Sequence, residues 1–217
     1  MVQCSTMQRV QYTIRPMEAR DIAQVAEIDR EAFPGEWVFR SHSSYKRDLD
    51  NPFVRYLVAC TTKHEAESGA PSPQKRPWFR RLFSSTQSSE AREDIIGFSG
   101  FWMMLREAHI IAIGVRDAYR RLGLGEALLI ATIDLASTLN ADAVTLEVRA
   151  SNEIAQTLYK KYGFQPVGRR LRYYSSDGED AIIMSTDSIS SASFQESFRQ
   201  LKKAHAERHG EILAWVC

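Results

Sequence analysis

The sequence predicts a mixed α/β (α+β) fold, because two patterns of apolar residues alternate along it. In some stretches every second residue is apolar, which is typical of half-buried strands; in others apolar residues recur every three or four positions, which is typical of amphipathic helices. The two kinds of stretch are interspersed along all 217 residues. The 44% of hydrophobic and 25% of charged residues are ordinary for a globular protein, so we expect one main domain.

The first half of the chain begins with a strand and a helix. Residues 10–16 alternate as a strand does, whereas Ile22, Val25 and Ile28 have the spacing of one helix face. A hairpin follows, with its turn near Arg106. The predicted elements are a strand at 10–16, helices at 18–32 and 40–50, and strands at 54–60, 95–105 and 107–115, the last with Ile111, Ile113 and Val115 on one face.

The second half opens with an apolar helix that begins at a glycine-containing turn, with Leu124, Leu128 and Leu135 on one side. Beyond residue 189 a polar stretch leads to an appended helix in which Phe194 and Phe198 recur at helical spacing. The predicted elements are helices at 123–139, 152–162 and 194–216 and strands at 143–148, 165–174 and 180–185.

Residues 61–94 differ from the rest, because Ser, Pro, Gln, Glu and Lys dominate and no period survives. We expect a flexible insert. Inside it, residues 75–83 mix basic and aromatic side chains, a combination that suits ribosomal RNA or an anionic membrane surface. A solvated loop is the favoured interpretation of this stretch.

Charge, cysteine content and hydropathy exclude several classes of protein. A formal net charge of +1 makes direct DNA binding unexpected. Cys4, Cys60 and Cys217 are scattered without metal-ligand spacing, so we expect neither a metal site nor disulfides. No apolar run approaches the roughly 20 residues that span a bilayer, and the polar start lacks a secretory signal, so we expect a cytoplasmic protein. The oligomeric state is left open.

The turn from Arg120 to Gly125 joins a predicted strand to a predicted helix and has the makings of an anion site. The first N–H groups of a helix lack intrahelical partners and lie at the positive end of its dipole, so phosphate groups dock there. Gly123 and Gly125 keep side chains out of that approach, and Arg120 and Arg121 add positive charge. Alone, such an R-x-x-G-x-G string is more often an ordinary loop.

A second block begins within the predicted strand at 143–148 and continues into the next helix. Alternation puts Val144, Leu146 and Val148 on one face and turns Glu147 to the other. Ser151 or Asn152 is a plausible cap for the next helix, and Tyr159 lies about two turns along it, so both can face one groove. By themselves, Glu147 would be read as a solvated charge and Tyr159 as a core aromatic.

Taken together, these blocks resemble the GNAT acetyltransferases, and the ordered set resembles the RimI family of ribosomal-protein alanine N-acetyltransferases. The resemblance spans approximately residues 12–185. It implies a mostly antiparallel sheet of about seven strands with helices on both faces, in a domain at 1–189 with the insert at 61–94 and a C-terminal helical extension at 190–217. The matching segments are Ala32-Phe33-Pro34, the turn at 120–125, residues 146–152, Leu158-Tyr159, Gly163-Phe164, Arg172-Tyr173-Tyr174 and residues 179–184.

The resemblance also implies a cosubstrate and roles for individual residues. Acetyl-CoA would be the acetyl donor, Glu147 the general base and Tyr159 the general acid that protonates the departing thiolate. A backbone N–H near Val115 would polarise the thioester carbonyl. The residues implied to bind the cofactor are Ile113, Gly114, Val115, Arg121, Leu122, Gly123, Leu124, Gly125, Glu126 and Asn152.

The implied substrate is a protein N-terminus, with the N-terminal alanine of a small-subunit ribosomal protein as the leading candidate. An α-amino group has an ordinary pKa of about 7.7–8.0, against about 10.4 for lysine, so one carboxylate base suffices. Lysine side chains, small amines and a non-catalytic CoA-binding or ribosome-associated module stay open as alternatives. Tyr173 and Tyr174 are either substrate contacts or plain strand formers, and His109 is favoured as a structural histidine.

Overall fold

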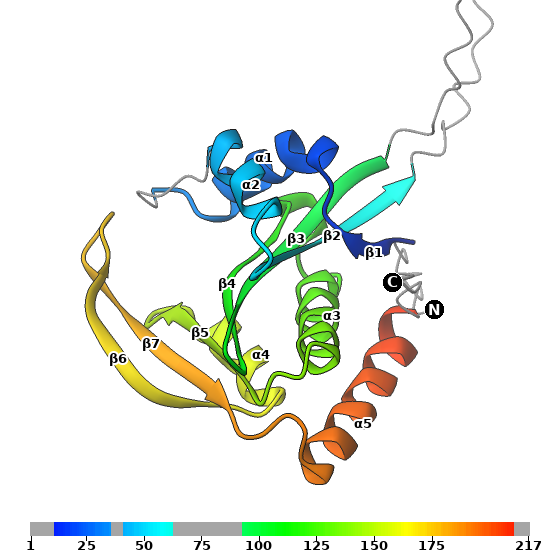
Figure 1. Ribbon diagram of the computed structural model, residues 1–217, viewed down its shortest axis with the longest axis vertical. Coiled ribbons are helices and arrows are strands. Elements are labelled where there is room, and N and C mark those ends of the chain that lie inside the picture. The colour runs from blue at the N-terminus through cyan, green and yellow to red at the C-terminus, as the bar shows by residue number, and fades with distance from the viewer. Residues whose placement is uncertain (1–10, 36–40, 63–92, 211–217) are drawn as a thin grey trace, which may run out of the picture.

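The computed structural model describes residues 11–35, 41–62 and 93–210. Within these ranges seven strands form one open sheet in the order β1-β2-β3-β4-β5-β7-β6 (Figure 1). Neighbouring strands are antiparallel except β4 and β5, which run parallel. The predicted mixed, mostly antiparallel sheet is therefore confirmed. Its strands are β1 (Thr13–Pro16), β2 (Val54–Thr62), β3 (Glu93–Met104), β4 (Glu107–Val115), β5 (Ala143–Arg149), β6 (Phe164–Tyr174) and β7 (Glu179–Thr186).

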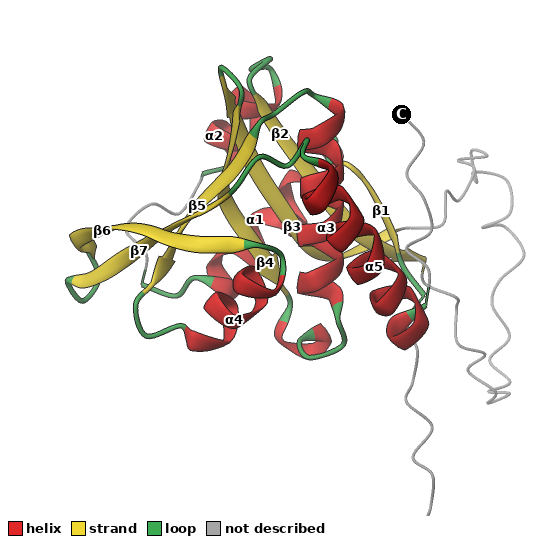
Figure 2. Ribbon diagram, turned by 90° about the horizontal axis from the view of Figure 1, so that it is seen from below, coloured by secondary structure: helices red, strands yellow, loops and turns green. Residues whose placement is uncertain are grey.

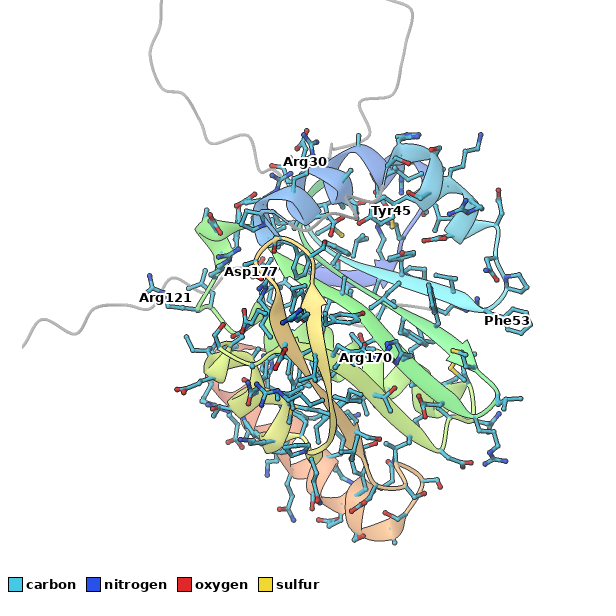
Figure 3. The ribbon with its side chains drawn as sticks, turned by 90° about the vertical axis from the view of Figure 1, so that its left-hand side faces the viewer. Arg30, Tyr45, Phe53, Arg121, Arg170 and Asp177 are labelled. Atoms are coloured by element: carbon cyan, nitrogen blue, oxygen red, sulfur yellow. The ribbon has the colours of Figure 1, made fainter. Side chains whose placement is uncertain are left out.

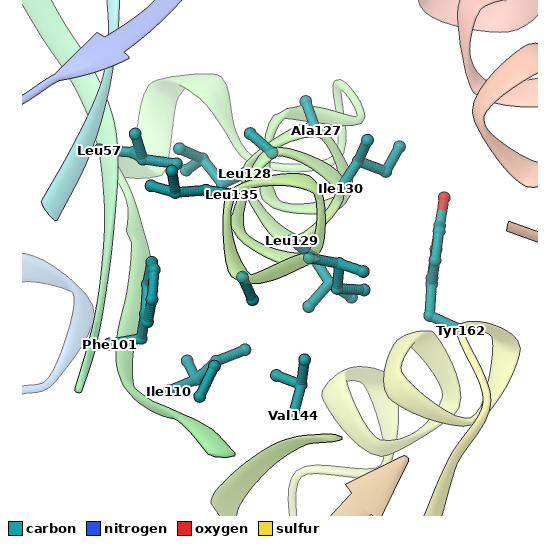
Figure 4. Close-up of a cluster of buried hydrophobic side chains, with 14 of the residues drawn as sticks. Leu57, Phe101, Ile110, Ala127, Leu128, Leu129, Ile130, Leu135, Val144 and Tyr162 are labelled. Carbon is teal, nitrogen blue, oxygen red and sulfur yellow. The ribbon is translucent and has the colours of Figure 1, made fainter. Parts of the chain in front are cut away.

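Helices cover both faces of the sheet, as predicted (Figures 1 and 2). On one face, α1 and α2 enclose a core that contains Tyr45 and Phe98. On the other, α3, α4 and α5 enclose a larger core around the apolar side of α3 (Figure 4). The helices are α1 (Ile22–Ala32), α2 (His42–Leu49), α3 (Leu124–Thr138), α4 (Glu153–Lys161) and α5 (Ala192–His209), with short 3₁₀ turns η1 (Ala19–Asp21) and η3 (Asp117–Tyr119).

The predicted insert is shorter than the sequence pattern suggests. Both of its ends belong to strands, because Thr61 pairs with Asp94 and Thr62 pairs with Glu93 in the β2–β3 ladder. Residues 63–92, with the basic and aromatic stretch at 75–83, lie outside the described residues, as do Cys4 and Cys217. The appended helix, predicted to reach residue 216, is described as far as His209.

The prediction that Ile111, Ile113 and Val115 share one face of β4 is wrong for Ile111. The β3–β4 register shifts between Gly100 and Phe101, so that Ile111 is an extra residue in β4. Such a bulge breaks the two-residue alternation of side chains. Ile111 consequently packs with the core beneath α1 and α2, while Ile113 and Val115 pack against the core beneath α3.

The same point of the sheet is where β4 and β5 part. Their parallel register runs only from Glu107 opposite Ala143 to Ile110 opposite Leu146. Beyond that, β4 continues to Val115 paired with β3, and β5 continues to Arg149 paired with β7. The two central strands therefore separate over their C-terminal halves, which opens the middle of the sheet next to the start of α3.

The C-terminal helix α5 packs along α3 (Figure 2). Phe198 is buried there with its ring stacked on that of Phe194, and Lys202 forms an ion pair of 2.9 Å with Asp134 of α3. His205 is buried one turn further along. Among the described residues, none of the helices combines the length and apolar character needed to cross a membrane.

Candidate active site

The separated end of β4 directs main-chain groups into the opening between β4 and β5. The Arg116 N–H donates to the Ile96 carbonyl, which fixes the hydrogen-bonding phase of the β3–β4 ladder. In an antiparallel ladder alternate residues face the same neighbour, so Gly114 faces β3, whereas Ile113 and Val115 face the side from which β5 has departed. Two of the predicted cofactor-binding residues thus present main-chain donors and acceptors to this opening.

Gly114 has a different constraint. A Cβ added to Gly114 would lie 2.6 Å from the Phe98 ring, so glycine here leaves room for a core aromatic on the other face of the sheet. The residue therefore shapes β4 through packing, while its neighbours Ile113 and Val115 supply the main-chain groups that face the opening.

The start of α3 borders the opening and carries unpaired donors. The first N–H of this turn with an intrahelical partner is that of Ala127, which donates to the Gly123 carbonyl at 2.9 Å. Within the described residues, no hydrogen bond satisfies the N–H groups of Leu124, Gly125 and Glu126. These three donors lie at the positive end of a fifteen-residue helix, which is the arrangement that binds a phosphate group.

Charged side chains flank this turn. Arg121 is exposed and has a left-handed backbone with φ of 62°, which an arginine adopts only at a cost in free energy (Figure 3). Arg120 forms an ion pair of 2.8 Å with Asp117 and donates to the Val115 carbonyl at 3.3 Å. The guanidinium of Arg120 is thus held beside the last residue of β4, whereas Arg121 projects towards solvent.

The two glycines of the turn differ in what they make possible. Gly123 has a φ of 82°, and a Cβ there would lie 2.7 Å from the ring of His209 in α5. A Cβ on Gly125 would meet only a methyl of Val115, at an ordinary 3.8 Å. Glycine is therefore required at position 123 by the left-handed backbone and by the close packing of α5. At position 125 a side chain would obstruct the approach of an anion without disturbing the packing of the protein.

The α5 histidines form a contact with this turn that the sequence did not reveal. His205 Nε2 lies 3.1 Å from the Gly123 carbonyl, and the side chains of His205, His209 and Glu126 gather at one point. Glu126 also receives hydrogen bonds from Lys161, at 2.5 Å, and from the Tyr162 hydroxyl, at 2.6 Å. The side chain of Glu126 is thus engaged behind the turn, and its main-chain N–H is the part that faces an anion.

Glu147 lies at the first β5 position beyond the pairing with β4. Its side chain is only 7% exposed, and its two oxygens have separate partners. His109 Nε2 of β4 is 2.8 Å from Oε2, and Arg170 of β6 is 2.9 Å from Oε1. Val144, Leu146 and Val148 pack into the core beneath α3, as the alternation predicted, so Glu147 projects from the opposite face of β5.

The surroundings of Glu147 set its charge. Burial raises the pKa of the carboxyl, but the hydrogen bond and charge of His109 and the charge of Arg170 outweigh burial, so that the net pKa is below its ordinary value. Glu147 is consequently a carboxylate throughout the neutral range. The ease with which this carboxylate accepts a proton depends on the charges of His109 and Arg170.

Tyr159 lies on α4, and its pKa is shifted in the opposite direction from that of Glu147. Burial raises the pKa of its phenol to about 12, so the hydroxyl keeps its proton near neutrality. The ring packs against Phe164 with centroids 5.7 Å apart. Within the described residues, no hydrogen bond involves this hydroxyl or joins Tyr159 to Glu147. Tyr159 packs against the core beneath α3, so the two side chains lie on opposite faces of β5.

Asn152 caps α4, which settles the choice between Ser151 and Asn152. Its Oδ1 accepts from the Ala155 N–H at 3.1 Å, so its amide NH₂ is the group left for a ligand. Arg149, at the end of β5, ties the β6–β7 hairpin to this region: it pairs with Glu179 at 2.7 Å and lies 4.0 Å from the centre of the Tyr174 ring.

Tyr174 thus helps to anchor the hairpin, whereas the ring of its neighbour is more open. Tyr173 is 46% exposed, and the guanidinium of Arg170 lies 5.5 Å from its ring centre. This places an accessible aromatic side chain on β6, the strand whose Arg170 pairs with Glu147. The position is compatible with a contact to a bound substrate, which stays a prediction.

The site has the parts that transfer of an acyl group to an amine requires: main-chain donors for an anion, an opening in the sheet, a carboxylate and a protonated phenol. A model of the acetyltransferase (GNAT) family matches residues 55–164, which include the opening, the turn at 120–125, Glu147 and Tyr159.

Individual relatives extend this similarity to most of the chain. The N-alpha-acetyltransferase RimI of Mycobacterium tuberculosis is 40% identical over 182 residues, covering 81% of this chain and 92% of that protein. The ribosomal protein bS18-alanine N-acetyltransferase of Escherichia coli K12 is 38% identical over 117 residues, covering 50% and 79%. The crystal structure of the ribosomal-protein-S18-alanine N-acetyltransferase from Escherichia coli matches with a TM-score of 0.61 and 26% identity over 84% of this chain and 97% of that one.

Proposed function

The chain belongs to the GNAT family of acetyltransferases, and we propose that it transfers the acetyl group of acetyl-CoA to the N-terminal α-amino group of a protein. The N-terminal alanine of a small-subunit ribosomal protein is the proposed substrate, by analogy with the relatives that are named for bS18. The observation that carries the proposal is the buried carboxylate of Glu147 beside an opening that ends at three unpaired N–H groups.

The site fits acetyl-CoA in its chemistry. A diphosphate needs several donors from one direction, and the N–H groups of Leu124, Gly125 and Glu126 supply them. The pantetheine arm carries amides, which pair with main-chain groups as a strand would, and Ile113 and Val115 face the opening with such groups unpaired by β5. The thioester would then lie in the opening, between Glu147 and Tyr159.

Three groups of this chain would act on the bound reactants. The Val115 N–H would donate to the thioester oxygen as negative charge develops there. Glu147 would take the proton from the attacking amine, and Tyr159 would give its phenolic proton to the departing sulfur. The lowered pKa of Glu147 keeps its carboxyl ionised and the pKa of about 12 keeps the Tyr159 phenol protonated, which are the states that a base and an acid need before transfer.

An N-terminal amine is the substrate from which this base can most easily remove a proton. Its ordinary pKa of about 7.7–8.0 leaves a sizeable neutral fraction at physiological pH, whereas a lysine, at about 10.4, leaves very little. A carboxylate with a lowered pKa is a weak base. Such a base is matched to an amine that is already close to losing its proton.

Matched peptides test this function. Purified protein is incubated with acetyl-CoA and a peptide that begins with the N-terminal residues of the organism's own bS18, and mass spectrometry locates the added acetyl group. We expect acetylation of the free peptide and none of the same peptide with a blocked α-amine. Acetylation of internal lysines in the blocked peptide would assign the enzyme to side-chain amines. If neither peptide caused CoA to be released, protein N-termini would be rejected as substrates.

Gly125 provides a separate test of the anion site. We expect Gly125→Ala to raise the KM for acetyl-CoA about tenfold, which corresponds to ~1.4 kcal/mol, because the added methyl group lies among the N–H groups that face the diphosphate. Stability should not fall, since the position is helical and its Cβ would meet nothing closer than 3.8 Å. Steady-state kinetics and a thermal melt measure the two effects.

Gly123→Ala is the matched contrast. Its Cβ would lie 2.7 Å from the His209 ring on a backbone with φ of 82°, so we expect a lower melting temperature as well as weaker binding. An unchanged KM in a stable Gly125→Ala protein would show that the diphosphate lies elsewhere.

A further inference from the structure

His109 is one member of a row of side chains that leads away from Glu147. On one side, His109 Nε2 is 2.8 Å from Glu147 Oε2. On the other, His109 Nδ1 is 2.9 Å from the Thr145 hydroxyl, which donates to Glu107 Oε1 at 2.8 Å. The parallel register explains the row, because His109 lies directly opposite Thr145 and Glu107 opposite Ala143. The side chain of Glu147 is almost enclosed, whereas Glu107 at the far end is exposed.

Counting donors along the row defines the protonation of His109. The Thr145 hydroxyl has one proton, which it gives to the Glu107 carboxylate, so it accepts from His109 Nδ1. The Glu147 carboxylate can only accept, so His109 Nε2 also donates. Both ring nitrogens therefore carry a proton, and in this arrangement His109 is an imidazolium.

A doubly paired carboxylate is a poor proton acceptor. The imidazolium of His109 and the guanidinium of Arg170 both stabilise the charge of Glu147, and of these two kinds of cation only an imidazolium has a neutral form in proteins. We propose that His109 is a positioning residue that controls proton uptake by Glu147, and that Thr145 and Glu107 form the route by which His109 releases its proton to water. The inference rests on the proposed role of Glu147 in acetyl transfer.

The proton transfers balance along this row. The Nδ1 proton of the imidazolium passes to Thr145 while the hydroxyl proton of Thr145 passes to Glu107 and from there to water. His109 is then neutral and keeps its Nε2 proton in the hydrogen bond to Glu147. With one of its two cations gone, Glu147 accepts a proton from the attacking amine, and it returns that proton to water after the product leaves.

Within the described residues, the ionisable side chains in contact with this row are Glu107, Glu147 and Arg170. Its register partner on β3 is Trp102, which does not titrate in this range. The charged group that β6 contributes is Arg170, which pairs with Glu147. From β4 and β5 the contributing groups are Glu107, Thr145 and Glu147 themselves.

The pH dependence of kcat/KM tests the inference in the intact enzyme with the bS18-type peptide. In the wild type we expect the reaction to require the loss of one proton from His109 and one from the peptide amine, so the acid side of the profile should be steep. In His109→Gln the amide still donates to Glu147 but has no charge to lose. The slope of log(kcat/KM) against pH on the acid side should therefore be lower by one, so that each unit of falling pH reduces activity about tenfold less than in the wild type. Thr145→Val keeps the shape of Thr145 and removes the acceptor for Nδ1, so the acid limb moves to lower pH.

His42→Gln is the matched control, because His42 lies exposed on α2; its profile should coincide with that of the wild type. A wild-type slope and midpoint in His109→Gln would overturn the inference, as would an unmoved limb in Thr145→Val if His109→Gln proved inactive. A wild-type protein that acetylates no peptide at any pH would instead reject the proposed function.

Discussion

Replacing Glu147 by glutamine lowers kcat by about 10²–10⁴-fold, the range that loss of a general base commonly causes. Glutamine has the size of glutamate and still fits between His109 and Arg170, but it cannot take a proton from the amine. The KM for acetyl-CoA should change little, because the groups proposed to hold that molecule are main-chain donors on β4 and α3. Steady-state kinetics with the peptide substrate separate the two parameters.

A loss of activity can be attributed to the missing base only if the Glu147→Gln protein remains folded. Arg170 is half exposed and can turn to water when the carboxylate is lost, so Glu147→Gln should remain folded. Glu207→Gln, an exposed change of the same kind on α5, should leave kcat as it is. Wild-type turnover in a folded Glu147→Gln enzyme would remove Glu147 from the mechanism and leave the amine to react unaided.

Much of the fold could be predicted from the sequence because the signals are local. Alternation along residues 143–148 was sufficient to place Val144, Leu146 and Val148 in the core and Glu147 on the opposite face, and the structure has this arrangement. The apolar period of α3 likewise gave a helix whose ends differ by one residue from the prediction. Each of these inferences depends only on residues that belong to one continuous stretch of the chain.

The features that escaped prediction depend on pairing between distant segments. His109 and Glu147 are 38 positions apart in sequence and meet only because of the short parallel register of β4 with β5. The bulge at Ile111 is a property of the β3–β4 ladder, and alternation along β4 alone gives no sign of it. The contact of His209 with Gly123 requires α5 to lie along α3, which helical spacing in α5 does not specify.

These long-range contacts also change how the site is understood. From the sequence, Glu147 was a single base and His109 a structural histidine. In the folded protein the two form one hydrogen-bonded pair, held on its other side by Arg170 of a hairpin that Arg149 secures to the end of β5. The basicity of the carboxylate is therefore a property of three strands together, and a change on β4 or β6 should alter catalysis without contacting either reactant.

Replacing Tyr159 by phenylalanine should lower kcat by about 10²-fold, at the lower end of the range for a general acid. A departing thiolate is less basic than an alkoxide, since an ordinary thiol has a pKa of about 8.5, so proton donation to sulfur contributes less than proton removal from the amine. Burial raises the pKa of Tyr159 to about 12, so the wild-type phenol is protonated and able to donate across the working pH range. Kinetics with the same peptide measure the loss.

Removing the hydroxyl of Tyr159 should affect catalysis without affecting stability. Within the described residues it has no hydrogen-bond partner, and the ring contact with Phe164 is unaffected by the change, so the free energy of unfolding should stay near the wild-type value. Tyr162→Phe is the structural contrast, because it loses the hydrogen bond to Glu126 and with it about 1–3 kcal/mol. Equal turnover by Tyr159→Phe and the wild type would mean that water protonates the sulfur, and that Tyr159 serves only to line the opening between β4 and β5.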